Sequence, residues 1–180
     1  MARKYFIFII FICCIGIMPG ISLTARQDDT TTLTPCFTPG HACTDKIISE
    51  INAARSEILV QAYSFTSAQI AKALVDAHKR GVKVEAILDK SQRTAKYSYA
   101  TFLANMRVPT YIDADHAIAH NKIIIIDRMT TITGSFNFTK AAQDKNAENL
   151  LIIRSKDIAR AYRENWANHL KHSEKYEPRY

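Results

Sequence analysis

Apolar positions along the chain change repeatedly between a helical spacing and continuous or alternating runs, which predicts helices alternating with strands. The first helical stretch begins near Thr44 and carries apolar side chains at Ile47, Ile48, Ile51 and Ala54. This spacing places them on one face of an amphipathic helix. Residues 58–64 follow as an apolar run that is typical of a buried strand.

The second helix has signals at both ends. Thr66 and Gln69 have the spacing of a capping box, and the expected helix runs to Arg80, where Gly81 ends it. Residues 82–89 then alternate apolar and charged side chains, which predicts a strand with one face partly in contact with water.

The remaining pattern completes the fold class. We expect a helix within residues 92–106, short strands over 110–113 and 149–153, and a final helix over 157–172. The final helix has an apolar stripe that we expect to face the core: Ile158, Tyr162, Trp166 and Leu170. Residues 123–126 are four consecutive isoleucines, and β-branched side chains without a helical period favour a strand buried on both faces. The predicted fold is therefore α/β, a single domain with a mixed β-sheet flanked by helices.

The first 25 residues have the layout of a secretory signal peptide. Arg3 and Lys4 precede an apolar run over residues 5–18, and we expect cleavage after Ala25. The run is shorter than the about 20 residues of a membrane span, so a retained anchor is the alternative that we rank second. A cleaved signal would direct a bacterial protein to the periplasm or out of the cell.

Cleavage would leave 155 of the 180 residues, which is the size of one domain. We expect a flexible polar leader over residues 26–40 and a folded domain over residues 41–175. Cys36 and Cys43 remain after cleavage, and in an oxidising compartment their spacing allows a disulfide. Two free thiols are the alternative.

The net charge of the whole chain is +7, and it becomes +5 without the signal segment, which holds two basic residues and no acidic one. An excess of this size fits a polyanionic partner, and it equally fits a solvated surface.

Polar residues of complementary chemistry gather at the ends of two neighbouring predicted strands. His120 and Lys122 lie at the start of the isoleucine strand, and Ser135 and Asn137 follow Gly134 near the end of the next one. Because side chains alternate along a strand, the two members of each pair can face the same way. An imidazole, an ammonium, a hydroxyl and an amide at one end of a sheet suit a phosphate diester.

Together with Asp127, these residues form the pattern His-x-Lys-x4-Asp-x6-Gly-Ser-x-Asn. The pattern resembles the signature of the phospholipase D superfamily, and a chain with one copy resembles the single-motif secreted bacterial endonucleases of that superfamily. The resemblance implies a phospholipase D-like nuclease domain over residues 41–175, with no cofactor and no metal. Two motifs meet at a two-fold axis in that superfamily, so the resemblance also implies a homodimer with its active site on the axis.

The expected mechanism gives each residue a role. His120 of one subunit attacks phosphorus and forms a phosphohistidine, while His120 of the other protonates the leaving oxygen and then activates water. Lys122 and Asn137 hold the non-bridging oxygens, and Ser135 adds a hydrogen bond. The resemblance places at Glu148 an acid that orients the nucleophilic imidazole.

Two motif residues are expected to serve the architecture. Asp127 ends the strand and begins a turn, so we expect it to be structural or to support the dimeric site. Gly134 allows a close backbone approach or an unusual conformation.

A divalent-metal nuclease is an alternative that we rank below phospholipid hydrolysis. Asp113, Asp115, His116 and His120 are suitable ligand types within eight residues, but they match no fixed ligand spacing. Activity that a chelator abolishes and a metal restores would favour it.

A non-catalytic nucleic-acid-binding protein is another alternative of lower rank. Arg93, Lys96, Tyr97 and Tyr99 combine cations with aromatic rings, a pattern compatible with phosphate contacts and base stacking, and equally with a helix surface.

For an enzyme, the positive charge, the small size and the single motif favour a nucleic acid substrate, DNA or RNA, over phospholipid. A membrane partner is expected only if the N-terminal segment is retained, and a cardiolipin-type phospholipid is then the alternative substrate.

Overall fold

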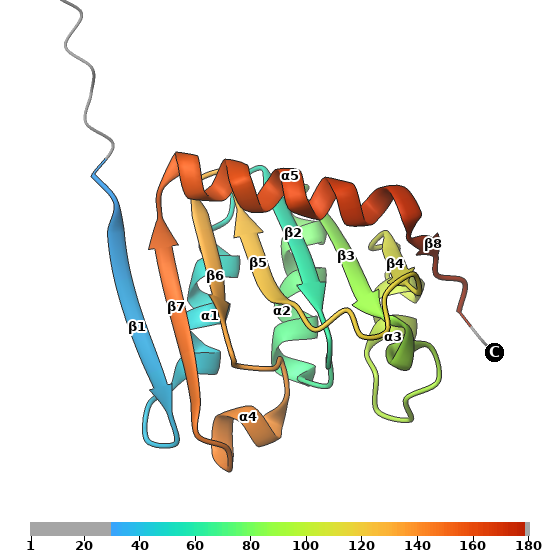
Figure 1. The fold of residues 1–180 in the computed structure, drawn as a ribbon, viewed down its shortest axis with the longest axis horizontal. Helices are drawn as coiled ribbons and strands as arrows, with labels where there is room; N and C mark the ends of the chain where they lie inside the picture. The colour runs from blue at the N-terminus through green and yellow to red at the C-terminus, as the bar shows by residue number, and fades with distance from the viewer. Residues whose placement is uncertain (1–29, 179–180) are drawn as a thin grey trace, which may run out of the picture.

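An eight-stranded β-sheet forms the centre of the protein, seen here in a computed structural model that describes residues 30–178 (Figure 1). The strands are β1 (Thr32–Thr38), β2 (Glu57–Ala62), β3 (Lys83–Asp89), β4 (Thr110–Asp113), β5 (Lys122–Ile126), β6 (Thr130–Gly134), β7 (Glu148–Arg154) and β8 (Glu174–Lys175). The helices are α1 (Cys43–Ala53), α2 (Ala68–Lys79), the 3₁₀ helix η1 (Lys90–Arg93), α3 (Ala100–Asn105), α4 (Lys140–Asp144) and α5 (Lys156–His172). The predicted signal peptide lies outside the described residues.

The sheet is mixed, as the sequence predicts, with the strand order β1-β7-β6-β5-β2-β3-β4-β8. β2, β3 and β4 run parallel to one another, and β5, β6 and β7 follow β2 as antiparallel neighbours. As a result β2, β3, β4 and β6 end at the same edge of the sheet at which β5 and β7 begin. We call this edge, which includes Asp89, Asp113, Lys122 and Gly134, the motif edge; it is the lower one in Figure 1.

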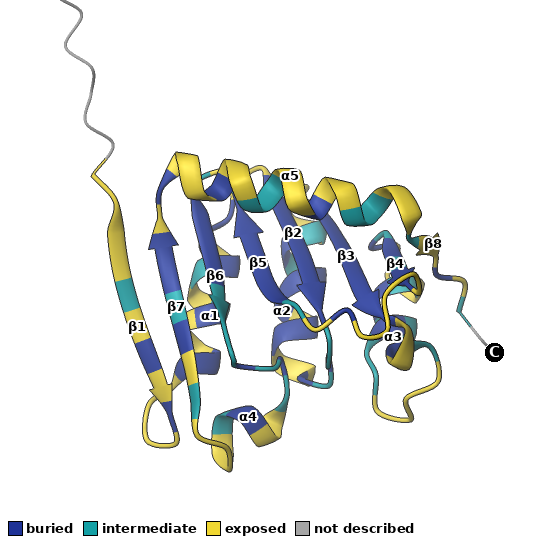
Figure 2. Cartoon of the chain, viewed as in Figure 1, coloured by how far each residue is buried: buried dark blue, intermediate teal, exposed yellow. Residues whose placement is uncertain are grey.

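Helices cover both faces of the sheet. α1, α2 and α3 lie on one face, and α5 crosses the other (Figure 1). In β5, Ile124 and Ile126 join the core on the α1 and α2 side, whereas Ile123 and Ile125 pack with Trp166 of α5. The central strands are buried along their length (Figure 2), so the predicted burial of the isoleucine strand on both faces is confirmed.

The prediction of a flexible leader is wrong for residues 32–38, which form the edge strand β1. β1 pairs antiparallel with β7 over its whole length, so its backbone polar groups have partners. Its inward side includes Cys36, which is 3% exposed and forms a disulfide with Cys43 at a Cα–Cα distance of 5.8 Å. The predicted disulfide is therefore confirmed. Threonine suits a strand with one solvated face, but the polar composition without an apolar run favoured a flexible leader in the sequence analysis.

Smaller differences concern helix boundaries. The N-cap of α2 is Ser67, whose side chain accepts a hydrogen bond from Ile70 N, and not Thr66. The expected helix within 92–106 is divided into η1 and the short α3. Among residues 30–178, no helix is both long and apolar enough to cross a membrane.

Candidate active site

The start of β5 brings the first two motif residues together at the motif edge. The Lys122 side chain is 6% exposed, and its Nζ donates a 2.7 Å hydrogen bond to the backbone carbonyl of His120. The His120 ring is at the surface and lies against the ring of Tyr63, with centroids 4.6 Å apart. Tyr63 also lies under the Lys122 ammonium, 5.2 Å from its ring centroid.

Tyr63 is thus a member of the site that the sequence analysis missed. It directly follows β2, and its backbone N–H donates to the carbonyl of Asn121 at 2.8 Å, which joins the ends of β2 and β5. The sequence does contain a signal for Tyr63, since it is an aromatic residue directly after a buried strand. In the structure that strand, β2, ends at the motif edge.

The end of β6 presents the second pair of motif residues. Gly134 has a φ of +148°, and a Cβ atom there would lie 2.3 Å from the backbone oxygen of Asn149. That oxygen accepts hydrogen bonds from the N–H groups of Ser135 and Phe136 at 3.0 and 3.2 Å. The close approach of β6 and β7 therefore requires glycine, and it fixes the backbone from which Ser135 projects.

Asn137 lies between Phe136 and Phe138, which are both fully buried. These phenylalanines anchor the segment, so Asn137 lies on its opposite side, at the pocket. The Asn137 Oδ1 atom is buried and has no hydrogen-bond partner among the described residues. A rotation of the amide by 180° places Nδ2 at the same position, so the side chain can supply a donor to a ligand oxygen there.

Glu148, at the start of β7, contributes the one carboxylate among the residues that line the pocket. Its carboxylate accepts a 2.6 Å hydrogen bond from Ser135 Oγ and a 2.9 Å bond from Asn146 Nδ2. Within residues 30–178 no hydrogen bond joins Glu148 to the His120 ring, so the predicted orienting contact is not made among these residues. Burial lowers the pKa of Lys122, and the negative charge of Glu148 partly opposes that shift.

A pocket of about 360 Å³ brings together five of the six predicted site residues. It is lined by His120, Lys122, Gly134, Ser135, Asn137 and Glu148. The arrangement combines an exposed imidazole with a buried cation, a hydroxyl and an amide, and these are groups that can attack and bind a phosphate ester.

Asp127 is the predicted site residue that the structure does not bring into the pocket. It follows β5 at the opposite edge of the sheet, with a φ of +51°. Its carboxylate accepts hydrogen bonds from the backbone N–H groups of Arg55, Ser56 and Glu57 at 2.8–3.0 Å. Burial raises the pKa of Asp127, but these bonds and one from the Ser56 hydroxyl outweigh burial and lower it. This placement agrees with the structural role that the sequence predicts.

The four residues that a divalent-metal nuclease would use as ligands do not lie together in the structure. Asp113 and His116 lie together, but neither Asp115 nor His120 joins them. Burial raises the pKa of Asp113, and hydrogen bonds from three histidines outweigh it and bring the pKa to about 2.

Of the four residues that the sequence analysis considered for phosphate contacts and base stacking, three lie together. Lys96, Tyr97 and Tyr99 line a hollow of about 590 Å³, and Lys96 Nζ lies 5.4 Å from the Tyr97 ring centroid. Arg93 instead forms an ion pair with Glu174 of β8.

Known proteins resemble this chain in sequence and in fold. The family described as cardiolipin synthase, phospholipase D-like domain matches residues 47–170. A phospholipase D of Rickettsia felis is 47% identical over 133 residues, which are 74% of this chain and 66% of that protein. The mitochondrial cardiolipin hydrolase of Mus musculus is 30% identical over 133 residues, 73% of this chain and 60% of that protein. The chain thus spans just under two thirds of the Rickettsia protein.

The fold comparison agrees. The crystal structure of Nuc, a phospholipase D family member from Salmonella typhimurium, superposes with a TM-score of 0.79 and 36% sequence identity, covering 82% of this chain and 99% of that one. The matched family region includes every residue that lines the pocket at the motif edge. The chain therefore belongs to the phospholipase D superfamily.

Proposed function

We propose that this protein is a metal-independent phosphodiesterase that hydrolyses nucleic acid, DNA or RNA, with little sequence preference. The observation that carries the proposal is the pocket at the motif edge, in which an imidazole, a buried ammonium, a hydroxyl and an amide converge. A phosphodiester has an electrophilic phosphorus and two non-bridging oxygens that share one negative charge. These four groups supply a nucleophile for the phosphorus and donors for the oxygens.

The first chemical step is attack by His120. A ring nitrogen of His120 forms a bond to phosphorus while the bond from phosphorus to the leaving oxygen breaks, which gives a phosphohistidine. Lys122 and Asn137 bind the non-bridging oxygens, whose charge must be stabilised as the bonds exchange. The leaving alkoxide takes a proton from a second acid.

The second acid is His120 of the partner subunit in a homodimer. Among the described residues, His120 is the one histidine that lines the pocket, and a single imidazole cannot be nucleophile and acid in the same step. A two-fold axis through the pocket supplies the second imidazole. After protonating the leaving oxygen, that imidazole takes a proton from water, and the hydroxide attacks phosphorus. The bond between His120 and phosphorus breaks, and a phosphate monoester is released.

Glu148 and Ser135 support the cation in this scheme. The carboxylate raises the pKa of Lys122, so it favours the charged ammonium that binds phosphate oxygens. The hydrogen bond from Ser135 Oγ holds the carboxylate in place.

Nucleic acid is favoured by the net charge of +5 that remains without the signal segment, and by the resemblance to the single-motif bacterial endonucleases. The surface near Lys96, Tyr97 and Tyr99 adds support, because a cation beside exposed rings can contact phosphates and stack on bases. A hydrolase of this kind would act after export, and the disulfide between Cys36 and Cys43 fits an oxidising compartment such as the periplasm.

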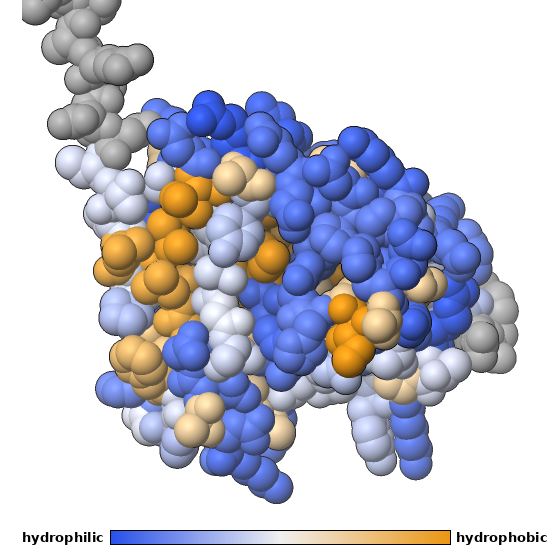
Figure 3. Space-filling model, viewed as in Figure 1, coloured by the Kyte–Doolittle hydropathy of each residue, from blue (hydrophilic) through white to orange (hydrophobic). Residues whose placement is uncertain are grey.

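Phospholipid hydrolysis is the second candidate. The relatives from Rickettsia felis and Mus musculus are called phospholipase D and mitochondrial cardiolipin hydrolase. An apolar surface over β1 and β7 (Figure 3) includes Leu33 and Phe37, which are 60% and 55% exposed, and a lipid surface would bury such side chains.

The test is to incubate the purified protein with plasmid DNA, single-stranded DNA, RNA and cardiolipin vesicles, each with and without EDTA. Cleavage of nucleic acid that persists in EDTA and is lost in His120→Ala is the expected result. Turnover of cardiolipin alone would replace the first candidate with the second. Equal turnover by the variant and the wild type would overturn the assignment of the nucleophile. Loss of cleavage in EDTA that metal restores would overturn the metal-independent mechanism, provided that circular dichroism shows the protein to remain folded in EDTA.

A further inference from the structure

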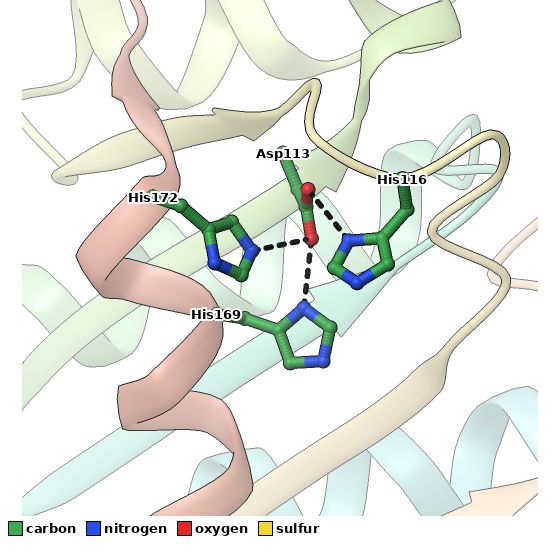
Figure 4. A group of neighbouring side chains, drawn as sticks. All are labelled: Asp113, His116, His169 and His172. Atoms are coloured by element: carbon green, nitrogen blue, oxygen red, sulfur yellow. Dashed lines mark hydrogen bonds and ion pairs between the residues drawn. The ribbon is translucent and has the colours of Figure 1, made fainter.

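Three histidines surround one buried carboxylate at the end of β4, outside the pocket of the motif. Asp113 is fully buried, and its oxygens lie near the rings of His116, His169 and His172 (Figure 4). His116 comes from the loop between β4 and β5, and the other two come from the last turn of α5. A spacing of three residues places His169 and His172 on the same side of that helix.

The cluster is tight and symmetrical. His169 Nδ1, His116 Nδ1 and His172 Nε2 lie 2.8, 3.1 and 3.4 Å from the Asp113 carboxylate. The three ring centroids are separated from one another by 5.0, 5.2 and 5.3 Å, so the rings form a nearly equilateral triangle. Each ring directs one nitrogen at an oxygen of the Asp113 carboxylate (Figure 4).

We propose that Asp113, His116, His169 and His172 bind one divalent transition-metal ion, and that this ion is Zn²⁺. Three neutral imidazoles and one carboxylate are a borderline donor set that suits Zn²⁺ and disfavours Mg²⁺ and Ca²⁺, which prefer oxygen ligands. The set has four protein ligands, which is the number of a closed tetrahedral structural site.

Metal binding would require small shifts in both directions: the wider ligand separations would shorten, and the 2.8 Å contact of His169 with Asp113 would lengthen. The four ligand atoms lie within 4.8 Å of one another. Zinc bonds to nitrogen and oxygen of about 2.0–2.1 Å give ligand separations of about 3.4 Å in a tetrahedron. His116 and His172 are partly exposed, with side chains 45% and 31% exposed, so their rings can turn inward, whereas the buried carboxylate is a fixed ligand.

The surroundings suit a cation. In the described part of the chain, the groups paired with the Asp113 carboxylate are these imidazoles and the N–H of Asp115, so no lysine or arginine competes for the position. The site lies at the C-terminal end of α5, where the helix dipole favours positive charge.

The ion would be structural and independent of the proposed reaction. His116 lies four residues before His120, on a loop that is already held at two points. Ala119 N donates to Asp89 Oδ2 at 2.8 Å, and Lys90 Nζ donates to the carbonyl of His116 at 2.9 Å. Zinc would add a third attachment, which joins this loop to the end of α5.

The test measures metal binding by the untagged full chain. The protein is stripped with chelator, dialysed and titrated with ZnCl₂ by calorimetry, and the bound zinc is counted after gel filtration. We expect one Zn²⁺ per chain and a rise of the Tm by about 5–10 °C at a zinc concentration of about 100 times Kd. His172→Ala and His169→Ala should each weaken binding by at least about 100-fold, because loss of a ligand costs more than loss of its supporting partner.

Two control variants test whether zinc binding depends on this cluster and not on histidines elsewhere. His41→Ala removes an exposed histidine elsewhere, and His120→Ala removes the imidazole of the pocket; both should bind zinc as the wild type does. Circular dichroism checks that each variant is folded, and His172→Gln is the substitute if His172→Ala is not. Wild-type binding no tighter than that of the folded His169 and His172 variants would overturn the proposal, as would zinc binding that His120→Ala abolishes.

Discussion

The ammonium group of Lys122 is hydrogen-bonded to the backbone carbonyl of His120, at 2.7 Å. The cation is therefore attached to the main chain of the residue whose ring we assign as nucleophile. Both side chains also contact the ring of Tyr63. A phosphate bound by Lys122 would accordingly be held at a fixed position relative to His120, which reduces the reorganisation needed for attack.

Lys122→Gln should lower the rate of phosphodiester hydrolysis by about 10²–10³-fold, the usual cost of removing one preorganised donor to a developing charge. The measurement is the initial rate on a bis-aryl phosphodiester, which also avoids any dependence on nucleic-acid binding. Lys140→Gln, at a lysine that is 88% exposed, is the matched control and should retain full activity. A loss smaller than tenfold in Lys122→Gln would contradict the role of this lysine.

The alkaline limit of activity should reflect Lys122. Burial lowers its pKa from the ordinary 10.5, and a lysine is charged only below its pKa, so activity should decline as pH rises through that lowered value. Glu148 opposes the shift, so Glu148→Gln should lower the pKa further and move the alkaline limb of the pH profile to lower pH. Profiles of kcat/KM for wild type, Glu148→Gln and the exposed control Glu177→Gln test this. If the alkaline decline of kcat/KM occurs at the same pH in Glu148→Gln as in the wild type, a group other than Lys122 determines it.

Mixed dimers test whether two copies of His120 serve one site. Inactive His120→Asn chains co-refolded with an equal amount of wild type should leave about a quarter of the wild-type activity per total chain, because only dimers with two intact histidines can turn over. Independent protomers would leave about half. The wild type refolded with itself fixes the reference value.

Gly134→Ala should destabilise the fold by about 3 kcal/mol or more, through a clash together with an unfavourable backbone conformation. The new Cβ would lie 2.3 Å from the backbone oxygen of Asn149. Gly81→Ala is a matched control, since Gly81 also has positive φ but has nothing within 4 Å of the added atom. Urea unfolding should give a clearly smaller loss, about 1–2 kcal/mol, for the control. Equal losses would show that the contact with β7 is unimportant.

Asp127→Asn should destabilise the protein at neutral pH by about 1–3 kcal/mol, because an amide NH₂ replaces an oxygen that accepts a backbone N–H. The pKa of Asp127 is lower in the folded chain than its ordinary 3.8, so the carboxylate contributes stability above that value and loses it as pH falls through the folded pKa. The difference between the two proteins in free energy of unfolding should therefore shrink below about pH 4. A difference that is constant from pH 7 to pH 3 would rule out the charge as its source.

The sequence predicts those parts of the molecule that depend on local patterns. The isoleucines of β5 and the helical spacing of α1 are signals within a few residues, and both elements form as expected. The pocket residues were also predictable, because alternation indicates which side chains of a strand share a face, the short connection suggests that the two strands pair, and the motif resembles a known signature.

Other features depend on partners that are distant in the chain. β1 looked like a polar leader because its stability comes from β7, more than a hundred residues later. Glu148 was expected to contact His120, but Ser135 and Asn146 lie nearer to its carboxylate. No local pattern marks His169 and His172, because only the crossing of α5 over the sheet brings them to Asp113.

The direction of β1 has a consequence for anything attached ahead of it. Thr32 pairs with Arg154 and Thr38 with Glu148, so the chain enters the sheet on the side away from the motif edge. Seven residues of extended strand separate the two sides by about 20 Å. A tether upstream of Thr32 would therefore be attached at the edge of the sheet opposite the motif edge. The pocket would then face away from the tether, toward substrates in solution.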